Sequence, residues 1–118
     1  MITYFDDLDG NLKGNDIANG EAYFIPTDFG STAIAYNPEE VTAEEVASLD
    51  VFLNPKFAGR MTLPDNVDDA YALGYLATGV DDWSNATDEQ FEAASDWLRK
   101  AHGNLRTYWT DAAELAQL

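Results

Sequence analysis

Short apolar runs alternate with longer amphipathic segments along this chain, and each kind of segment predicts a different element. Runs of four or five mostly apolar residues, bounded by Gly, Asn, Asp or Pro, are typical of strands. Such runs lie at 22–25, 32–36, 60–63 and 105–109. The sequence therefore predicts four short strands.

Between and after these runs, apolar residues recur every three or four positions, as on one face of a helix. Glu45 and Gln90 each follow a threonine by three positions, which is the spacing of a capping box at a helix start. The predicted helices cover 42–52, 66–78, 87–102 and 110–118. Their predicted N-caps are Thr42, Asn66, Thr87 and Thr110.

Two of the predicted helices carry clear apolar stripes. Val67, Ala70, Tyr71 and Gly74 share one face of the helix over 66–78. The stripe of the helix over 87–102 consists of Phe91, Ala94, Leu98 and Ala101. We expect both stripes to be buried. Trp83 lies in the polar loop between these helices, where an exposed tryptophan would suggest contact with a partner.

Strands that alternate with helices are typical of an α/β fold, with a mostly parallel sheet flanked by helices. Residues 1–20 are rich in Asp, Asn and Gly, which favour turns, so we expect an irregular lead-in there. The remaining residues, 21–118, are predicted to form a single domain.

The composition of the chain limits its partners. It has 118 residues, of which 22 are acidic and 6 are basic, for a formal net charge of −16. Nucleic acid is excluded as a partner because phosphate binding requires clustered Lys and Arg. A cationic ligand would be attracted, although acidic residues spread over a surface also serve solubility or adaptation to salt. No apolar run is long enough to span a membrane, and no signal peptide pattern follows Met1.

Catalytic and metal chemistry find little support in the sequence. There are no cysteines, and His102 is the single histidine. The serines lie in no nucleophile-elbow pattern, and no glycine-rich loop could hold a phosphate. Asp7–Asn11 does not match the spacing of a calcium loop. We therefore predict no catalytic residues, no metal site and no cofactor, and a binding module rather than an enzyme.

Three segments in order resemble the spermidine/putrescine-binding proteins, a family of bacterial periplasmic solute-binding proteins. Residues 23–37 combine an aromatic strand, a proline turn, an aromatic-Gly pair and a small-residue strand that ends in Asn. Residues 53–65 hold a Pro-Lys-aromatic-x-Gly turn before a strand and an acidic turn. Residues 87–97 and 104–111 resemble a long helix, a strand and a threonine-acid helix start.

The resemblance implies a fold and a transport function. It implies most of the second lobe of a type II periplasmic binding protein, a three-layer α/β/α lobe that closes on its ligand against a first lobe. The ligand would be a polyamine, spermidine or putrescine, and the protein partner would be the permease of an ABC transporter. A periplasmic location would require a signal peptide that is absent from this sequence. The alternatives are a lobe for iron, a phosphonate or an amino acid, and a sensor or interaction domain without transport.

The same resemblance places candidate ligand residues just after the strand over 60–63. Family acids that contact the ligand amines fall on Asn66 and Asp69, where Asp69 keeps the acid and Asn66 offers a carbonyl oxygen without charge. Asp65 and Asp68 are close enough to compensate. The alternative is purely structural, because Asn at an N-cap and Asp in a first turn stabilise any helix.

Three further residues are candidates near the hinge that the resemblance implies. Phe29 occupies an aromatic position, and Ser31 and Thr32 could donate hydrogen bonds to a ligand. Packing at the hinge is the alternative for all three. If a return strand of the family is missing, the sheet has an open edge, so we also predict a dimer or swapped assembly of this chain.

Overall fold

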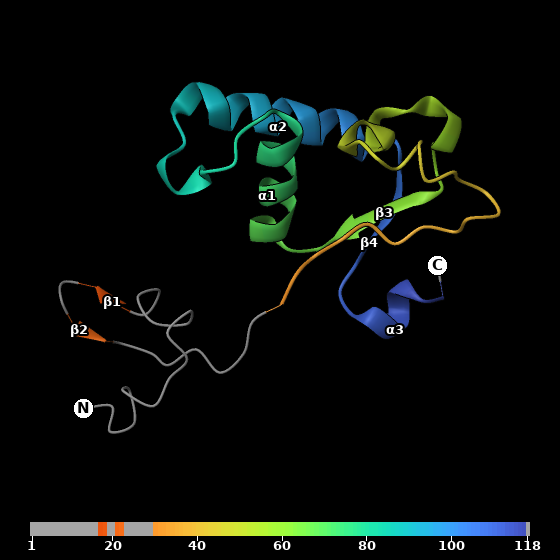
Figure 1. Cartoon of the computed structure of the whole chain (residues 1–118), viewed down its shortest axis with the longest axis horizontal. Coiled ribbons are helices and arrows are strands. Elements are labelled where there is room, and N and C mark those ends of the chain that lie inside the picture. Colours follow the sequence, from red (N-terminus) through yellow and green to blue (C-terminus); the bar gives the residue numbers. More distant parts are fainter. Residues whose placement is uncertain (1–16, 19–20, 23–29, 118) are drawn as a thin grey trace. The chain divides into compact units, whose positions relative to one another are not determined.

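The structure of the chain is a computed structural model, and it describes residues 17–18, 21–22 and 30–117 (Figure 1). The chain divides into two compact units, Met1–Ala35 and Tyr36–Leu118. Nearly all of the regular secondary structure that can be described belongs to the second unit.

In the first unit, two very short strands pair. β1 (Ile17–Ala18) runs antiparallel to β2 (Glu21–Ala22). Two residues of the predicted irregular lead-in thus form a strand, while 23–25 of the next predicted strand lie outside the described residues. The prediction of a strand over 32–36 is wrong: these residues form no strand and are mostly exposed. Among the described residues no segment pairs with them, and of their side chains only Ile34 is even half-buried, so they bury little apolar surface.

The second unit is built on a parallel pair of strands joined by two helices. The order is β3 (Met61–Pro64), α1 (Val67–Ala77), α2 (Asp88–His102) and β4 (Leu105–Trp109). β3 and β4 pair in parallel and lie side by side in Figure 1. The predicted α/β class and the parallel pairing are confirmed in these residues, and the three-layer arrangement stays a prediction.

Local irregularity fixes the register of the two strands. Met61 pairs with Leu105, but Thr62 pairs with Thr107, so Arg106 bulges out of the ladder. The Thr62 hydroxyl donates a hydrogen bond to the Thr107 carbonyl oxygen at 2.9 Å. The side chain thereby adds a bond next to the position where the ladder is interrupted.

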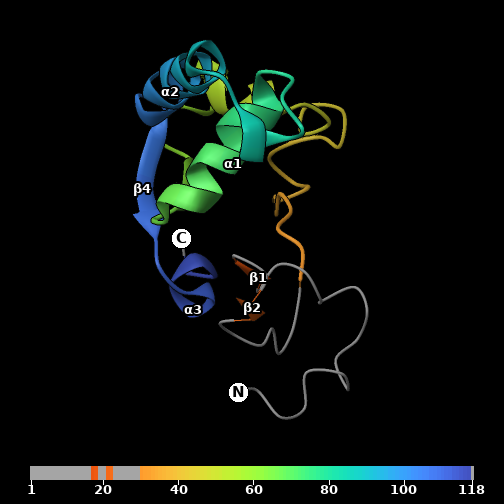
Figure 2. The same ribbon diagram turned by 90° about the vertical axis from the view of Figure 1, so that its left-hand side faces the viewer.

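The core of this unit lies where α1, α2 and a short 3-10 helix, η2 (Leu49–Leu53), meet. Figures 1 and 2 show α1 crossing α2 steeply. At the crossing, a Cβ on Gly74 would lie 3.1 Å from the Ala94 carbonyl oxygen, so the glycine allows the close approach. Phe52 of η2 meets Trp97 edge to face, with ring centroids 6.2 Å apart. The buried apolar residues are Val51, Phe52, Phe57, Leu63, Tyr75, Ala94, Trp97 and Ala101.

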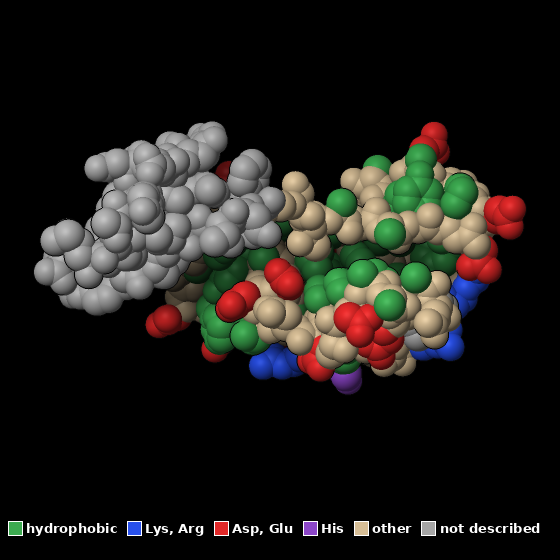
Figure 3. All heavy atoms as spheres, turned by 90° about the horizontal axis from the view of Figure 1, so that it is seen from below, with side chains coloured by type: hydrophobic (Ala, Val, Ile, Leu, Met, Phe, Trp, Pro, Cys, Tyr) green, Lys and Arg blue, Asp and Glu red, His purple; other side chains and the backbone are tan. Residues whose placement is uncertain are grey.

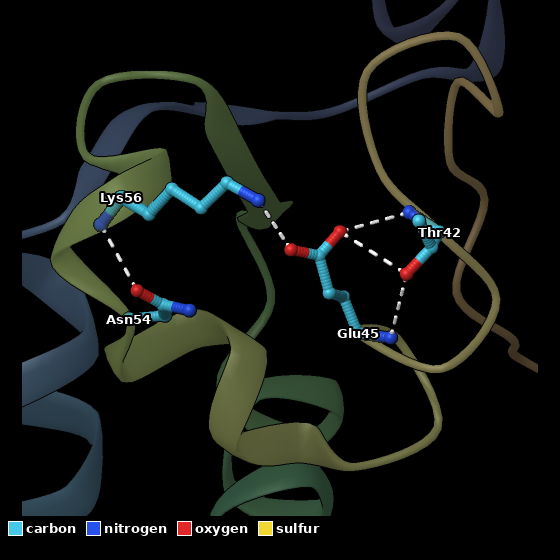
Figure 4. Close-up of polar contacts among 4 residues, drawn as sticks. All are labelled: Thr42, Glu45, Asn54 and Lys56. Atoms are coloured by element: carbon cyan, nitrogen blue, oxygen red, sulfur yellow. Dashed lines mark hydrogen bonds and ion pairs between the residues drawn. The ribbon is translucent and has the colours of Figure 1, made fainter.

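The helix predicted over 42–52 is wrong, although its capping box forms. The Thr42 hydroxyl accepts from the Glu45 N–H at 3.3 Å, and a Glu45 carboxylate oxygen accepts from the Thr42 N–H at 2.9 Å (Figure 4). Turns follow instead of an α-helix. The Ser48 side chain accepts from the Asp50 N–H at 3.2 Å, and this second cap begins η2. The segment is therefore divided into two short turns.

The second oxygen of Glu45 holds this turn against the next one. Glu45 Oε1 accepts a charged hydrogen bond from Lys56 Nζ of η3 (Pro55–Phe57), as Figure 4 shows. Asn54 caps η3 by accepting from the Lys56 N–H at 3.0 Å. The hydrogen bond from Lys56, followed by that from the Thr42 backbone, lowers the pKa of Glu45 below its ordinary value.

The other predicted helices form, with a changed cap at the last. The Thr87 box is complete, so α2 begins as expected. α3 (Ala112–Leu115) is capped by Asp111 rather than by Thr110 and is shorter than predicted. None of the helices formed by the described residues is both long and apolar enough to cross a membrane.

Candidate functional site

The candidate site lies at the edge where β3 and β4 both end. Because the strands are parallel, their carboxyl ends meet at one edge, which is where ligands bind in open α/β sheets. The Asp65 N–H donates to the Trp109 carbonyl oxygen at 2.8 Å, so the turn after β3 lies directly beside the end of β4. We call this region the carboxyl edge and define it by residues 65–69 and 110–114.

Asn66 acts as the cap of α1. Its side-chain oxygen accepts from the N–H groups of Asp68 at 2.9 Å and Asp69 at 3.2 Å. Both bonds satisfy donors that a helix start leaves without partners. The structural role of Asn66 is therefore confirmed, and its carbonyl oxygen is already committed to the helix.

Three acids lie around this cap, and unlike Asn66 their side chains take no part in capping α1. Asp65, Asp68 and Asp69 are all exposed. None of their carboxylates accepts a hydrogen bond or an ion pair from another described residue. Asp68 and Asp69 stand in the first turn of α1, where the helix dipole favours negative charge. The turn thus presents three carboxylates that are available to a cation from solution.

The turn between β4 and α3 adds two acids that the sequence patterns did not single out. Asp111 accepts from the Glu114 N–H at 2.8 Å, and Glu114 accepts from the Thr110 N–H at 3.0 Å. Asp111 therefore caps α3, while Glu114 reaches back to the residue before the cap, so the two bonds do not form a capping box. The spacing of three residues was the available signal, but Thr110 stands one residue earlier and was chosen as the cap. Both carboxylates help to hold the turn.

The remaining predicted site residues are not brought to this edge by anything the structure describes. Ser31 and Thr32 belong to the other compact unit, and both are exposed. Phe29 lies outside the described residues. Their proposed contact with a ligand stays a prediction.

The charge of the carboxyl edge and its lack of a metal-binding arrangement within the described residues limit which ligands it could bind. Figure 3 shows one face of the molecule, on which acidic side chains recur around a hydrophobic band and basic ones are few. Within the described residues, no group of three or more His, Asp or Glu side chains is arranged to hold a metal ion. His102 instead contacts Tyr108, with Nδ1 2.7 Å from the hydroxyl oxygen. What the edge offers is carboxylates in solvent next to a helix start.

In open α/β sheets small ligands bind at the carboxyl ends of the strands, and exposed carboxylates lie at that edge here. The family model described as "Bacterial extracellular solute-binding protein" matches residues 1–118, and the chain belongs to this family. The resemblance found from the sequence motifs is thereby confirmed.

Individual relatives agree with that family. The chain is 27% identical over 111 residues to the spermidine/putrescine-binding periplasmic protein of Escherichia coli (strain K12). It is 23% identical over 111 residues to the protein of the same name from Salmonella typhimurium (strain LT2). Each alignment covers 93% of this chain but 31% of the relative, so the chain spans about a third of the length of these proteins. No solved structure matches the chain.

Proposed function

We propose that this chain is part of the second lobe of a polyamine-binding protein that serves an ABC transporter. The observation that carries the proposal is the set of three exposed carboxylates at the carboxyl edge, Asp65, Asp68 and Asp69, which accept no bond from another described residue. The two relatives compared above are named for spermidine and putrescine, and they support this ligand class.

The chemistry of a polyamine fits such an edge. Its ammonium groups are separated by methylenes, so several carboxylates are needed to reach them, and charge-assisted hydrogen bonds are the strongest kind available. Asp69 keeps the acid that the family resemblance places against an amine, whereas Asn66 is committed to capping. Asp65 and Asp68 flank the cap and supply charge where Asn66 does not. The net charge of −16 adds a long-range attraction for a cation at low salt.

The setting of the site is part of the same proposal. A first lobe would close on the ligand, a permease would receive it, and the protein would act in the periplasm after loss of a signal peptide. The chain would then function in binding and not in catalysis. The predicted self-association of the chain also remains a proposal, and light scattering at high concentration tests it directly.

Calorimetry with the full-length gene product tests the ligand. We expect spermidine and putrescine to release heat on binding, and Asp69→Asn to weaken binding about tenfold, because one charge-assisted hydrogen bond contributes on the order of 1.5 kcal/mol. Asp50→Asn is the matched control: Asp50 is an exposed acid in η2, away from the carboxyl edge, and its replacement should change the affinity less than about twofold.

Two results would contradict the proposal. Binding of ferric ion, a phosphonate or an amino acid, with no heat from either polyamine, would assign the lobe to another solute. Equal affinities for Asp69→Asn and Asp50→Asn would place the ligand away from the carboxyl edge.

A further inference from the structure

A second feature of the same unit lies along the side of α1, next to the carboxyl edge. An open hollow of about 580 Å³ is bounded by α1, by the loop that follows it and by the start of α2. Its lining includes Val67, Asp68, Tyr71, Tyr75, Trp83 and Phe91. We call this feature the aromatic hollow.

Aromatic rings form a continuous wall of the hollow. Tyr71 and Phe91 stack with their planes 2° apart and their centroids 5.0 Å apart. Tyr75 continues the wall, with its centroid 6.1 Å from that of Tyr71. The Tyr71 hydroxyl lies 2.8 Å from the hydroxyl oxygen of the buried Ser95, which fixes the central ring. The wall is therefore set by packing and hydrogen bonding before any ligand arrives.

The loop after α1 returns to the helix and brings Trp83 into the lining. Gly79 has φ of 86°, a conformation that glycine adopts without strain. The Gly79 N–H donates to the Leu76 carbonyl at 3.2 Å, and the Val80 N–H donates to the Tyr75 carbonyl at 2.8 Å. This pair of bonds is a Schellman motif, which ends the helix and reverses the chain. Trp83 then stands in η4 (Trp83–Asn85).

Three large apolar side chains of the hollow are exposed, whereas Tyr75 is buried and Tyr71 is half-buried. Val67 is 68% exposed, Trp83 is 43% exposed and Phe91 is 49% exposed. The helical periodicity predicts that Val67 and Phe91 are buried, and both predictions are wrong. Large apolar side chains exposed together mark a binding surface more often than a structural one.

The charge of the residues that line the hollow limits the chemical class of ligand that it could bind. Asp68 is the single charged residue among those that line it. A cation placed between a carboxylate and several aromatic rings is attracted by the charge of the carboxylate and also by the quadrupoles of the rings. We propose that the aromatic hollow binds a small organic ammonium compound, with the cationic group at Asp68 and its methyl groups against the rings.

The shape of the lining separates this ligand from a polyamine. A polyamine is slim and carries several ammonium groups, so it requires carboxylates spaced along its length. The hollow offers one carboxylate and a wide aromatic wall. A compact cation with an apolar body, such as a trimethylammonium group, covers such a wall better and leaves no second charge unpaired.

The hollow and the carboxyl edge share Val67 and Asp68 but differ in all their other residues. Successive residues of a helix are about 100° apart around its axis, so Asp68 shares a face with Tyr71, Ala72 and Tyr75. Asp69 falls on the neighbouring face and does not line the hollow. The inference does not require polyamine binding, and the residues that the two sites do not share, Phe91 in the hollow and Asp69 at the carboxyl edge, allow the sites to be tested separately.

Choline and its uncharged carbon isostere, in which a tert-butyl group replaces the trimethylammonium group, are suitable probes. We would titrate each into the 118-residue chain and follow the indole N–H resonance of Trp83 by NMR. Choline should shift this resonance in a saturable way, and the isostere should bind at least about fivefold more weakly because it lacks the cation–π and carboxylate attractions.

Matched variants assign the contacts. Asp68→Asn should weaken choline binding about fivefold, and Phe91→Ala should weaken it similarly while leaving the Trp83 resonance as a reporter. Asp69→Asn, one residue away, should leave choline binding unchanged. In the full-length gene product the effects should reverse for spermidine, with Asp69→Asn weakening it and Phe91→Ala leaving it unchanged.

Three outcomes would overturn the inference. Equal binding of choline and the isostere would show a merely apolar surface. Equal effects of Asp68→Asn and Asp69→Asn on choline would show general attraction to the acidic surface. Loss of choline binding in the full-length gene product would show that another segment of the protein covers the hollow. The proposed polyamine site is tested by a separate measurement, spermidine binding to the Asp69→Asn variant of the full-length gene product.

Discussion

Two segments of this chain begin with the same capping box, and only one of them becomes an α-helix. At Thr42 and Glu45 the reciprocal hydrogen bonds measure 3.3 and 2.9 Å. At Thr87 and Gln90 they measure 3.2 and 2.9 Å. The first box is followed by turns and η2, the second by the fifteen residues of α2. The local motif is thus the same and cannot be what decides the outcome.

Packing along the segment accounts for the difference. After Thr87, one face of the chain buries Ala94, Trp97 and Ala101, and the intervening Ser95 donates its hydroxyl to the Phe91 carbonyl oxygen at 2.9 Å instead of capping a new turn. After Thr42, Ser48 supplies a second cap after half a dozen residues, and the buried residues Val51 and Phe52 follow it. A capping box satisfies two backbone donors, whereas tertiary packing supplies most of the stability of a helix.

The largest expected effect comes from removing the packing of α2. Trp97→Ala should lower the free energy of unfolding by about 3–5 kcal/mol, because Trp97 is buried against Phe52. Val46→Ala, at a half-buried position after the first box, should cost about 1 kcal/mol or less. Urea denaturation followed by circular dichroism measures both. Similar losses for the two variants would contradict the explanation from packing.

A milder variant at the same position refines the test. Trp97 Nε1 is buried and has no hydrogen-bond partner among the described residues, which is unfavourable in itself. Trp97→Phe keeps much of the ring and removes this donor, so it should destabilise the chain far less than Trp97→Ala. A loss as large as that of the alanine variant would mean that the indole nitrogen has a partner after all.

The two capping boxes should also differ in how much each contributes to the free energy of unfolding. Thr87→Ala should cost about 1 kcal/mol and reduce the helical circular dichroism signal, because the cap supports a long helix. Thr42→Ala should cost a few tenths of a kcal/mol, since the turn it supports carries little buried surface. Equal losses in urea denaturation would imply that a capping box stabilises both segments to the same extent, whether or not an α-helix succeeds it.

The smallest expected effect concerns the charge of Glu45, which distinguishes the capping box at Thr42 from the one at Thr87. Glu45 has a lowered pKa, so its bond to Lys56 stabilises the folded chain above the unfolded pKa of about 4.3, and this stabilisation disappears as pH falls through the folded pKa. Lys56→Met removes the largest cause and should raise the pKa of Glu45 in an NMR titration. Lys100→Met, in the last turn of α2, should leave it unchanged.

The same contrast between local motif and packing limits how much of the fold could be predicted. Asn66, Thr87 and Gln90 were identified correctly, because caps depend on residues a few positions apart. β3 and β4 were found within a residue of their ends. The segment over 32–36 has the composition of a strand but lacks a pairing partner in the described residues, and pairing is a non-local property.

The residues of the candidate site also fall into two groups, those that the sequence indicated and those that only the structure revealed. The sequence and its resemblance indicated Asp65, Asp68 and Asp69, and all three lie exposed at the carboxyl edge. The acids of the turn after β4, Asp111 and Glu114, were not selected, because only the parallel pairing of β3 with β4 brings that turn next to Asp65. The aromatic hollow was missed because its members come from α1, η4 and α2.

By itself, the sequence determined the α/β class, two of the four predicted helix starts and the strongly acidic surface, and its motifs indicated the family. The fold class, the helix starts and the charge follow from composition and from contacts between residues close in the chain, whereas the family follows from the resemblance of its ordered motifs. The tertiary structure decided which capping box begins an α-helix, which apolar residues are exposed and which acids lie together. Each of these depends on burial between segments distant in sequence, where the free energy of packing exceeds that of any local preference.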